Sequence, residues 1–144
     1  MDKSFLYQNA SDVRKNWSYT IDTVVHDKPA FINRTHDYFM MLNEETLRNV
    51  LKDFVFHLEV SEESDGSLTG FIKELDLVGN ASNKDKLLEL LVHDMKDYAQ
   101  DFYSEYSYWS KAPNRAPHIP YILKILISED EALISDIYVM EDKK

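Results

Sequence analysis

Apolar residues near the start of the chain recur at helical spacing. They predict a helix that Asn9 or Ser11 caps by accepting a hydrogen bond from a free backbone N–H group. The helix is expected to end near His26, ahead of Pro29, and a short strand over residues 5–7 is expected before it. The positions on its apolar face are Val13, Trp17, Ile21, Val24 and Val25.

Two apolar runs of strand length follow, at residues 31–32 and 39–42, on either side of a polar turn. They predict a hairpin. Asn43 then stands where it can cap a second helix with an acidic first turn, which suits the positive end of the helix dipole. The apolar face of that helix holds Leu47, Val50 and Leu51.

From residue 54 the apolar period changes to two, which is typical of a strand with one buried face. The Asp65-Gly66 dipeptide predicts a hairpin turn into a second strand over residues 68–75. A third short strand is expected at residues 77–78, before Gly79 and Asn80 end it. The second half of the chain therefore begins with a three-stranded pattern.

The longest helix of the chain is expected next, with Ser82 at its start in a capping-box-like arrangement. Three prolines between residues 110 and 120 break the helical pattern. The tail, residues 121–140, is expected to form two short helices divided near Ser128. The helix carries one apolar stripe at spacings of three and four, formed by Leu88, Leu91, Met95, Tyr98, Phe102 and Tyr106.

These patterns predict an α+β fold in two parts. A small N-terminal β-α-β-β-α unit, residues 1–53, is followed by an antiparallel β-sheet packed on a long helix, residues 54–144. The length of 144 residues allows one ordinary domain or two small ones.

Charge is distributed unequally along the chain, whose net charge is −10. Residues 1–55 hold seven Lys and Arg against eight Asp and Glu, a net charge of −1. Residues 56–144 hold nine against eighteen, a net charge of −9. The second segment therefore repels nucleic acid and suits a basic protein partner, because phosphate contacts need local positive charge.

Several classes of chemistry are excluded by what the sequence lacks. The chain has no cysteine, which rules out disulfides, thiolate zinc sites and cysteine nucleophiles. It has no phosphate-binding glycine loop, His-Glu-x-x-His motif or Gly-x-Ser-x-Gly elbow. No catalysis, cofactor or metal is therefore expected. Without a long apolar run or a signal-peptide core, a cytoplasmic location is expected.

The first third of the chain, roughly residues 4–55, resembles the prevent-host-death/YefM family of antitoxins in its order of helix, hairpin and helix. The residues that match the family's motifs are Ser11, Arg14, Asn16 and Trp17 in the first helix and Ile32, Asn33 and Arg34 at the hairpin. The resemblance implies a homodimer or higher even oligomer that binds operator DNA and represses its own operon. It also implies a cognate toxin, for which a RelE-type ribonuclease is the natural candidate.

The second part, with Gly66 and Gly70 in its hairpin, looks like the small antitoxin fold named after HicB. That fold would be a partial ribonuclease-H-like sheet without the carboxylate cluster that binds metal in a nuclease. The resemblance implies that residues 54–144 form the toxin-binding domain. We therefore interpret the chain as an antitoxin of a type II toxin–antitoxin system, and not as an enzyme.

Four residues are candidates for DNA contact. Arg14 and Lys15 are expected at the N-terminal end of the first helix, and Arg34 on the turn between two strands, so that three cations would converge on one edge. Asn16 is a candidate for a contact to an adenine edge. The alternative is that these residues are ordinary surface charges.

An acidic stripe on the long helix is the candidate toxin-binding surface, because it would complement a basic toxin. Its members are Asp94, Asp97, Asp101 and Glu105. The alternative is a solvated helix face. The aromatic residues between positions 102 and 109 are expected to pack in the core or at a protein interface, because base-stacking surfaces lie in positively charged grooves.

Two other functional classes stay open. The chain could be a DNA-free protein-interaction module that uses the same acidic surface. It could also be a metal-dependent nuclease that uses Asp65, Glu74 and Asp76, although these positions fall on a turn and at a strand end.

Overall fold

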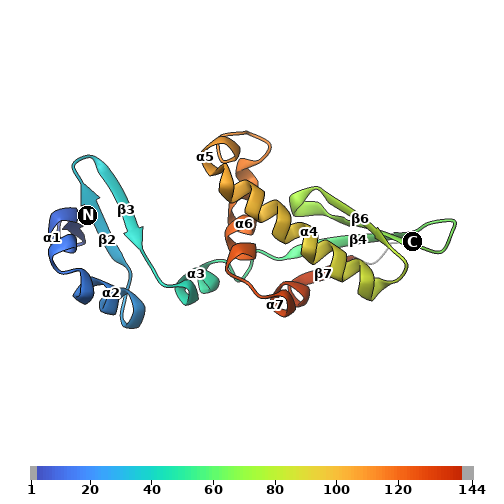
Figure 1. The fold of residues 1–144 in the computed structure, drawn as a ribbon, viewed down its shortest axis with the longest axis horizontal. Coiled ribbons are helices and arrows are strands. Elements are labelled where there is room, and N and C mark those ends of the chain that lie inside the picture. Colours follow the sequence, from blue (N-terminus) through green and yellow to red (C-terminus); the bar gives the residue numbers. More distant parts are fainter. Residues whose placement is uncertain (1–2, 141–144) are drawn as a thin grey trace. The chain divides into compact units, whose positions relative to one another are not determined.

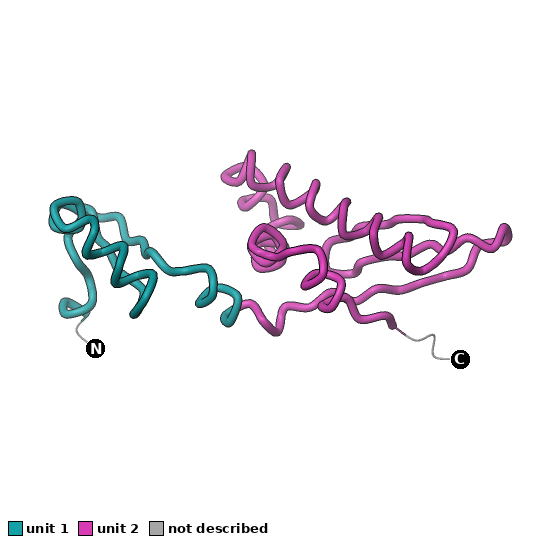
Figure 2. The backbone as a smooth tube through the Cα atoms, turned by 60° about the horizontal axis from the view of Figure 1, so that its bottom comes forward, with its two compact units in different colours: residues 1–50 teal, residues 51–144 magenta. Residues whose placement is uncertain are grey.

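A computed structural model describes residues 3–140 of the chain, and it confirms the α+β class. Most of the elements are labelled in Figure 1. The chain divides into two compact units, residues 1–50 and residues 51–144 (Figure 2). Within residues 3–140, no helix combines the length and the apolar content that crossing a membrane requires.

Unit 1, residues 1–50, is a three-stranded sheet with helices in the connections. Its strand order is β1-β2-β3, where β1 and β2 are parallel and β2 and β3 are antiparallel. Two helices connect the parallel strands, as a parallel pair requires. The elements are β1 (Tyr7–Asn9), α1 (Ala10–Lys15), α2 (Trp17–His26), β2 (Ala30–Arg34), β3 (Asp37–Met41) and α3 (Glu44–Val50).

The single helix predicted up to His26 is in fact two helices, because Asn16 interrupts it. Its backbone angles, φ −113° and ψ 39°, lie outside the helical region. Its side-chain amide donates a hydrogen bond to the Asp12 carbonyl at 3.1 Å, a local bond that competes with the helix. The first strand begins at Tyr7, later than predicted, and Asn9 is the residue that caps α1, by accepting a hydrogen bond from the Ser11 N–H at 2.8 Å.

The core of unit 1 is small. Val13 and Val24, from α1 and α2, pack against Ala30 and Ile32 of β2. The predicted cap of α3 is confirmed, since Asn43 accepts a hydrogen bond from the Thr46 N–H at 2.8 Å. However, α3 itself contributes no buried residue.

Unit 2, residues 51–144, is a four-stranded sheet with helices along one side. Its strand order is β6-β5-β4-β7. Helix α4 packs against β5 and β6, and α6 and α7 pack against α4. The elements are β4 (Phe56–Glu62), β5 (Leu68–Ile72), the 3-10 turn η1 (Lys73–Leu75), β6 (Leu77–Ala81), α4 (Lys84–Ser104), α5 (Tyr106–Trp109), η2 (Ala116–His118), α6 (Ile119–Leu126), α7 (Asp130–Ser135) and β7 (Ile137–Met140).

The end of the chain differs from the prediction. The two short helices are present as α6 and α7, but residues 137–140 form strand β7, parallel to β4. Ile137 is paired with Phe56 and Met140 with Glu59, so the sheet is mixed and not purely antiparallel. A partner strand about eighty residues away supplies this pairing, and local sequence patterns do not report such a contact.

Smaller differences concern element boundaries. Strand β4 begins at Phe56, two residues after the predicted start, and β6 continues through Gly79 and Asn80. Asn83, and not Ser82, caps α4 by accepting a hydrogen bond from the Lys86 N–H at 2.9 Å. Asn83 takes this position because its backbone is extended, as an N-cap requires.

The core of unit 2 lies between the sheet and α4. From the predicted stripe, Leu91, Met95 and Phe102 are almost fully buried. Gly70 and Gly79 are paired across β5 and β6 directly beneath the helix. A Cβ atom at either position would lie about 3 Å from leucine side chains of this core, 2.9 Å from that of Leu58 at Gly70 and 3.1 Å from that of Leu91 at Gly79. The two glycines therefore allow α4 to approach the sheet closely.

A buried lysine links the segment before β4 to the segment before β7. The Lys124 ammonium group donates a hydrogen bond to the Phe54 carbonyl at 2.7 Å and lies 3.1 Å from a carboxylate oxygen of Asp136. The Asp136 carbonyl in turn accepts a hydrogen bond from the Phe56 N–H. These bonds hold the segments that lead into β4 and β7 side by side.

Candidate protein and DNA surfaces

The structure places Arg14 and Lys15 in the last turn of α1, and not at the N-terminal end of the helix as predicted. The difference follows from the interruption at Asn16, which makes α1 only six residues long. Both side chains are exposed. Cations at this end of a helix interact favourably with its dipole, which is a structural reason for their presence.

Arg34 lies at the end of β2, next to the turn that leads into β3. Its guanidinium group pairs with Asp37 at 3.3 Å, and both side chains are more than two-thirds exposed. An exposed pair of this kind contributes little to stability and leaves the arginine accessible. The turn residue Thr35 has a φ of +56°, an unusual value for a β-branched residue.

The Asn16 side chain is already engaged in the hydrogen bond to the Asp12 carbonyl. A contact from its amide nitrogen to a base would compete with this bond. Asn16 remains exposed at the junction of α1 and α2.

An apolar groove of about 280 Å³ lies in unit 1 between α1, the start of α2 and the sheet. Trp17 and Phe39 are about half exposed at this groove. Its lining residues are Ala10, Val13, Arg14, Trp17, Ile32, Phe39 and Met41. Several of these residues were predicted on apolar faces, but the sequence does not show that part of each face remains uncovered. Exposed apolar surface of this kind makes the groove a candidate interaction site.

The acidic stripe is present on α4, with one change at its end. Asp94, Asp97 and Asp101 lie within the helix, and Glu105 is its C-cap residue. Asp97, Asp101 and Glu105 are exposed, and Asp94 is partly buried. The four carboxylates therefore lie along one flank of α4, where a partner can reach them.

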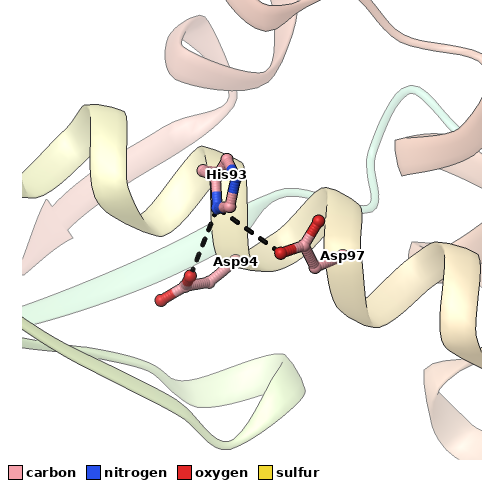
Figure 3. Close-up of side chains that lie close together, drawn as sticks. All are labelled: His93, Asp94 and Asp97. Atoms are coloured by element: carbon pink, nitrogen blue, oxygen red, sulfur yellow. Dashed lines mark ion pairs between the residues drawn. The ribbon is translucent and has the colours of Figure 1, made fainter.

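His93 stands beside this stripe and was not among the predicted site residues. Its Nδ1 atom lies 3.6 Å from a carboxylate oxygen of Asp94 and 3.5 Å from one of Asp97 (Figure 3). Among the described residues, these three form the one group of at least three ligand-type side chains close enough to hold a metal ion. His93 and Asp97 are exposed and Asp94 is partly buried. The spacing of one helical turn between His93 and Asp97 brings these two side chains together.

The carboxylates of the nuclease hypothesis do not gather into such a group within residues 3–140. Asp65 accepts hydrogen bonds from the backbone N–H and the hydroxyl group of Ser67. Both bonds lower the pKa of Asp65, and the bond from the hydroxyl group has the larger effect. Glu74 accepts hydrogen bonds from the backbone N–H and the Nδ1 atom of His57. The Asp65 and Glu74 side chains are thus engaged locally.

A polar cluster joins α4 to the segment after α5. The Tyr98 hydroxyl lies 2.6 Å from Nδ1 of buried His118 and accepts a hydrogen bond from Arg115 at 3.2 Å. The Arg115 guanidinium group also lies over the Tyr98 and Trp109 rings. Burial, and then the nearby charge of Arg115, lower the pKa of His118.

The aromatic residues predicted to pack in the core or at a protein interface divide into two groups. Phe102 is buried, and Tyr106 packs edge-on against it. Tyr103 and Tyr108 are about two-thirds exposed. They therefore do not all join the core.

Comparisons with known proteins give a consistent result. Residues 5–139 match a family model described as an antitoxin of toxin–antitoxin systems, RelE/RelB. A solved structure from Syntrophomonas wolfei subsp. wolfei, described as the antitoxin part of a proposed toxin/antitoxin system, is 37% identical in sequence with a TM-score of 0.88. The similarity covers 93% of this chain and 97% of that one. No curated protein matches the chain.

Proposed function

The chain belongs to this family of antitoxins from RelE/RelB toxin–antitoxin systems. We propose that its two units have different functions. Unit 2 binds and neutralises the cognate toxin, which we propose to be a RelE-type ribonuclease. Unit 1 forms a homodimer, binds operator DNA and represses the operon. The resemblance of unit 1 to prevent-host-death/YefM antitoxins and of unit 2 to the HicB fold supports this division.

The observation that carries the toxin-binding proposal is the unequal distribution of charge. Unit 2 holds ten Lys and Arg against nineteen Asp and Glu, and four of these acids follow one flank of α4. A basic toxin would be attracted to this flank, because complementary charge steers association and favours the correct partner. The contact masks the toxin's basic surface, which an enzyme acting on RNA needs.

Calorimetric titration with the toxin tests whether the α4 flank binds it. The double variant Asp97→Asn, Asp101→Asn should bind the toxin about tenfold or more weakly at low salt, as measured by calorimetry, and should lose most of its salt dependence. The matched control is Glu129→Gln, Glu131→Gln, which removes two exposed acids elsewhere in unit 2. Equal affinities for both double variants would refute the role of the flank.

The apolar groove of unit 1 supports the homodimer. It exposes Trp17 and Phe39 on a unit whose own core is small, and a second copy would cover both. The dimer would present two copies of Arg14, Lys15 and Arg34 to the phosphate backbone. About six phosphate contacts would give a slope of roughly −5 in log affinity against log salt.

Gel-shift titrations against the DNA upstream of the operon test this edge. Arg14→Ala and Arg34→Ala should each weaken binding and make the salt slope shallower by about one unit per lost contact, or two in the dimer. Lys28→Ala, which removes an exposed cation between α2 and β2, is the control and should keep the slope. Unchanged slopes in both arginine variants would favour a DNA-free interaction module.

Toxin binding and DNA binding are coupled in this proposal. If the toxin changes the affinity of the dimer for its operator, the operator must change the affinity for the toxin by the same factor. Measuring both affinities with and without the other ligand tests this reciprocity.

A further inference from the structure

The sheet of unit 2 has two very different faces. The helices cover one face, where Gly70 and Gly79 lie beneath Leu91. Strand residues that alternate with the buried ones point to the opposite face. We call this second surface the open sheet face, and its members are His57, Glu59, Ser61, Thr69, Phe71, Val78, Asn80, Tyr138 and Met140.

Large apolar side chains are exposed on this face. Val78 is 61% exposed, Tyr138 54% and Met140 42%, whereas Phe71 lies partly buried between neighbouring strands. Val78 and Phe71 are paired across β6 and β5. Tyr138 and Met140 lie on β7, beyond His57 and Glu59 of the intervening strand β4. Solvent-exposed apolar residues spread over several strands of one sheet indicate an interaction surface.

The open sheet face also carries little net charge. Among the strand residues that point to it, Glu59 is acidic, and it pairs with Lys73 at 3.7 Å. His57, also on this side, is held by the partly buried Glu74 carboxylate. The rest of unit 2 has a strong excess of acid, so this face is nearly neutral on an otherwise negative body.

We propose that the open sheet face binds the same face of a second copy of this chain. Two bodies with a net charge of −9 each repel one another, and the repulsion is smallest where a neutral, apolar surface meets its copy. A twofold axis pairs the surface with itself, in the way that two sheets pack face to face. A basic toxin, by contrast, finds its complementary charge on the α4 flank.

This contact goes beyond the proposed function because it needs neither DNA nor toxin. It is separate from the proposed pairing of unit 1, which uses a different set of residues. A chain that pairs through both surfaces forms a more stable dimer or a higher even oligomer.

Sedimentation equilibrium of the full chain tests the proposal. In a Phe39→Glu background, which places a charge at the unit 1 groove, the remaining self-association should come from unit 2. Adding Val78→Glu and Tyr138→Glu should then weaken it at least tenfold, because like charges would face each other. The control is Tyr103→Glu on α4, another exposed aromatic residue, which should leave the association constant unchanged. A monomeric Phe39→Glu chain at all concentrations would overturn the inference.

Chemical cross-linking gives a second readout that does not depend on adding charge. Since the chain has no cysteine, Tyr138→Cys, Val78→Cys and Tyr103→Cys each carry one thiol. A short bismaleimide should link copies of at least one of the two sheet-face variants several-fold faster than copies of Tyr103→Cys. Equal rates for all three would overturn the inference. If Arg14→Ala and Arg34→Ala leave DNA binding unchanged while the sheet-face link persists, the DNA proposal alone fails.

Discussion

Unit 1 and unit 2 differ in how much of their apolar surface they bury within themselves. Among residues 3–140, unit 2 has fourteen buried apolar residues in one cluster, whereas unit 1 has four. Unit 1 nevertheless exposes large apolar side chains, among them Trp17, Tyr38, Phe39 and Met40. A fifty-residue unit with so small a core is marginal by itself, because a short chain buries a smaller fraction of its surface.

This difference in buried apolar surface indicates that a binding partner has a different effect on each unit. For unit 1 a second copy would supply burial that the fold itself lacks. Unit 2 buries a larger core within itself. For this unit we propose that two outer surfaces, the acidic flank of α4 and the open sheet face, serve recognition. If the two units unfold independently, a substitution in one unit should leave the stability of the other unchanged.

The largest effect is expected from a cavity in the core of unit 2. Leu91→Ala should lower the free energy of unfolding of this unit by about 2–5 kcal/mol, because the side chain is fully buried between α4 and the sheet. The chain offers a reporter for each unit, Trp17 in unit 1 and Trp109 in unit 2. Urea denaturation of the Trp17→Phe background, followed by Trp109 fluorescence, measures the loss.

The corresponding variant of unit 1 is Ile32→Ala, which removes a side chain that is 1% exposed. It should shift the Trp17 signal, read in a Trp109→Phe background, and leave the Trp109 signal in place. If either cavity moved both signals equally, the units would unfold as one and the comparison would fail.

The next effect concerns the buried lysine that joins the two ends of unit 2. Lys124→Met should cost about 2 kcal/mol, because the Phe54 carbonyl and the Asp136 carboxylate lose their shared cation. Lys96→Met is the matched control, since it breaks the more exposed ion pair with Asp130 and should cost less than about 1 kcal/mol. Similar losses for both would show that burial of Lys124 contributes nothing.

A smaller effect is expected from the helix caps, where the same substitution can be made in each unit. Asn83→Ala in unit 2 and Asn9→Ala in unit 1 each remove an acceptor for a helical N–H and should cost about 1 kcal/mol. Each loss should appear only in the tryptophan signal of its own unit. A loss that appeared in both signals would indicate coupling between the units.

The smallest effect is a pH dependence confined to unit 2. Burial lowers the pKa of His118, so the unfolded chain binds a proton more readily than the folded one. The contribution of His118 to stability is therefore complete above pH about 6.5, the ordinary histidine pKa, and is lost as the pH falls towards the lower pKa of the folded state.

Melting curves between pH 7.5 and 5, at about half-unit steps, measure this loss. The His118→Gln variant should be less stable at neutral pH and should show a flatter pH profile in the Trp109 signal. Arg115, Tyr98 and Asp76 are the groups that surround His118, and Asp76 acts in the opposite direction to burial. A variant with the same profile as the natural chain would refute the assignment.

Local patterns in the sequence determined most of the elements. The α+β class, the hairpins, the long helix and the Asn43 cap follow from periodicity, turn dipeptides and capping residues, which act within a few positions of one another. The acidic stripe on α4 was also visible, because helical spacing alone places its residues on one flank. The family resemblance added the antitoxin identity.

Tertiary structure decided the features that depend on distant partners. β7 exists because residues 137–140 pair with β4, and no local signal distinguishes this apolar segment from the end of a helix. The apolar groove of unit 1 and the open sheet face of unit 2 are likewise invisible in sequence, since periodicity shows which side chains are apolar but not which are covered. Burial is a property of the packed chain, and it alone separates a core position such as Leu91 from an exposed one such as Val78.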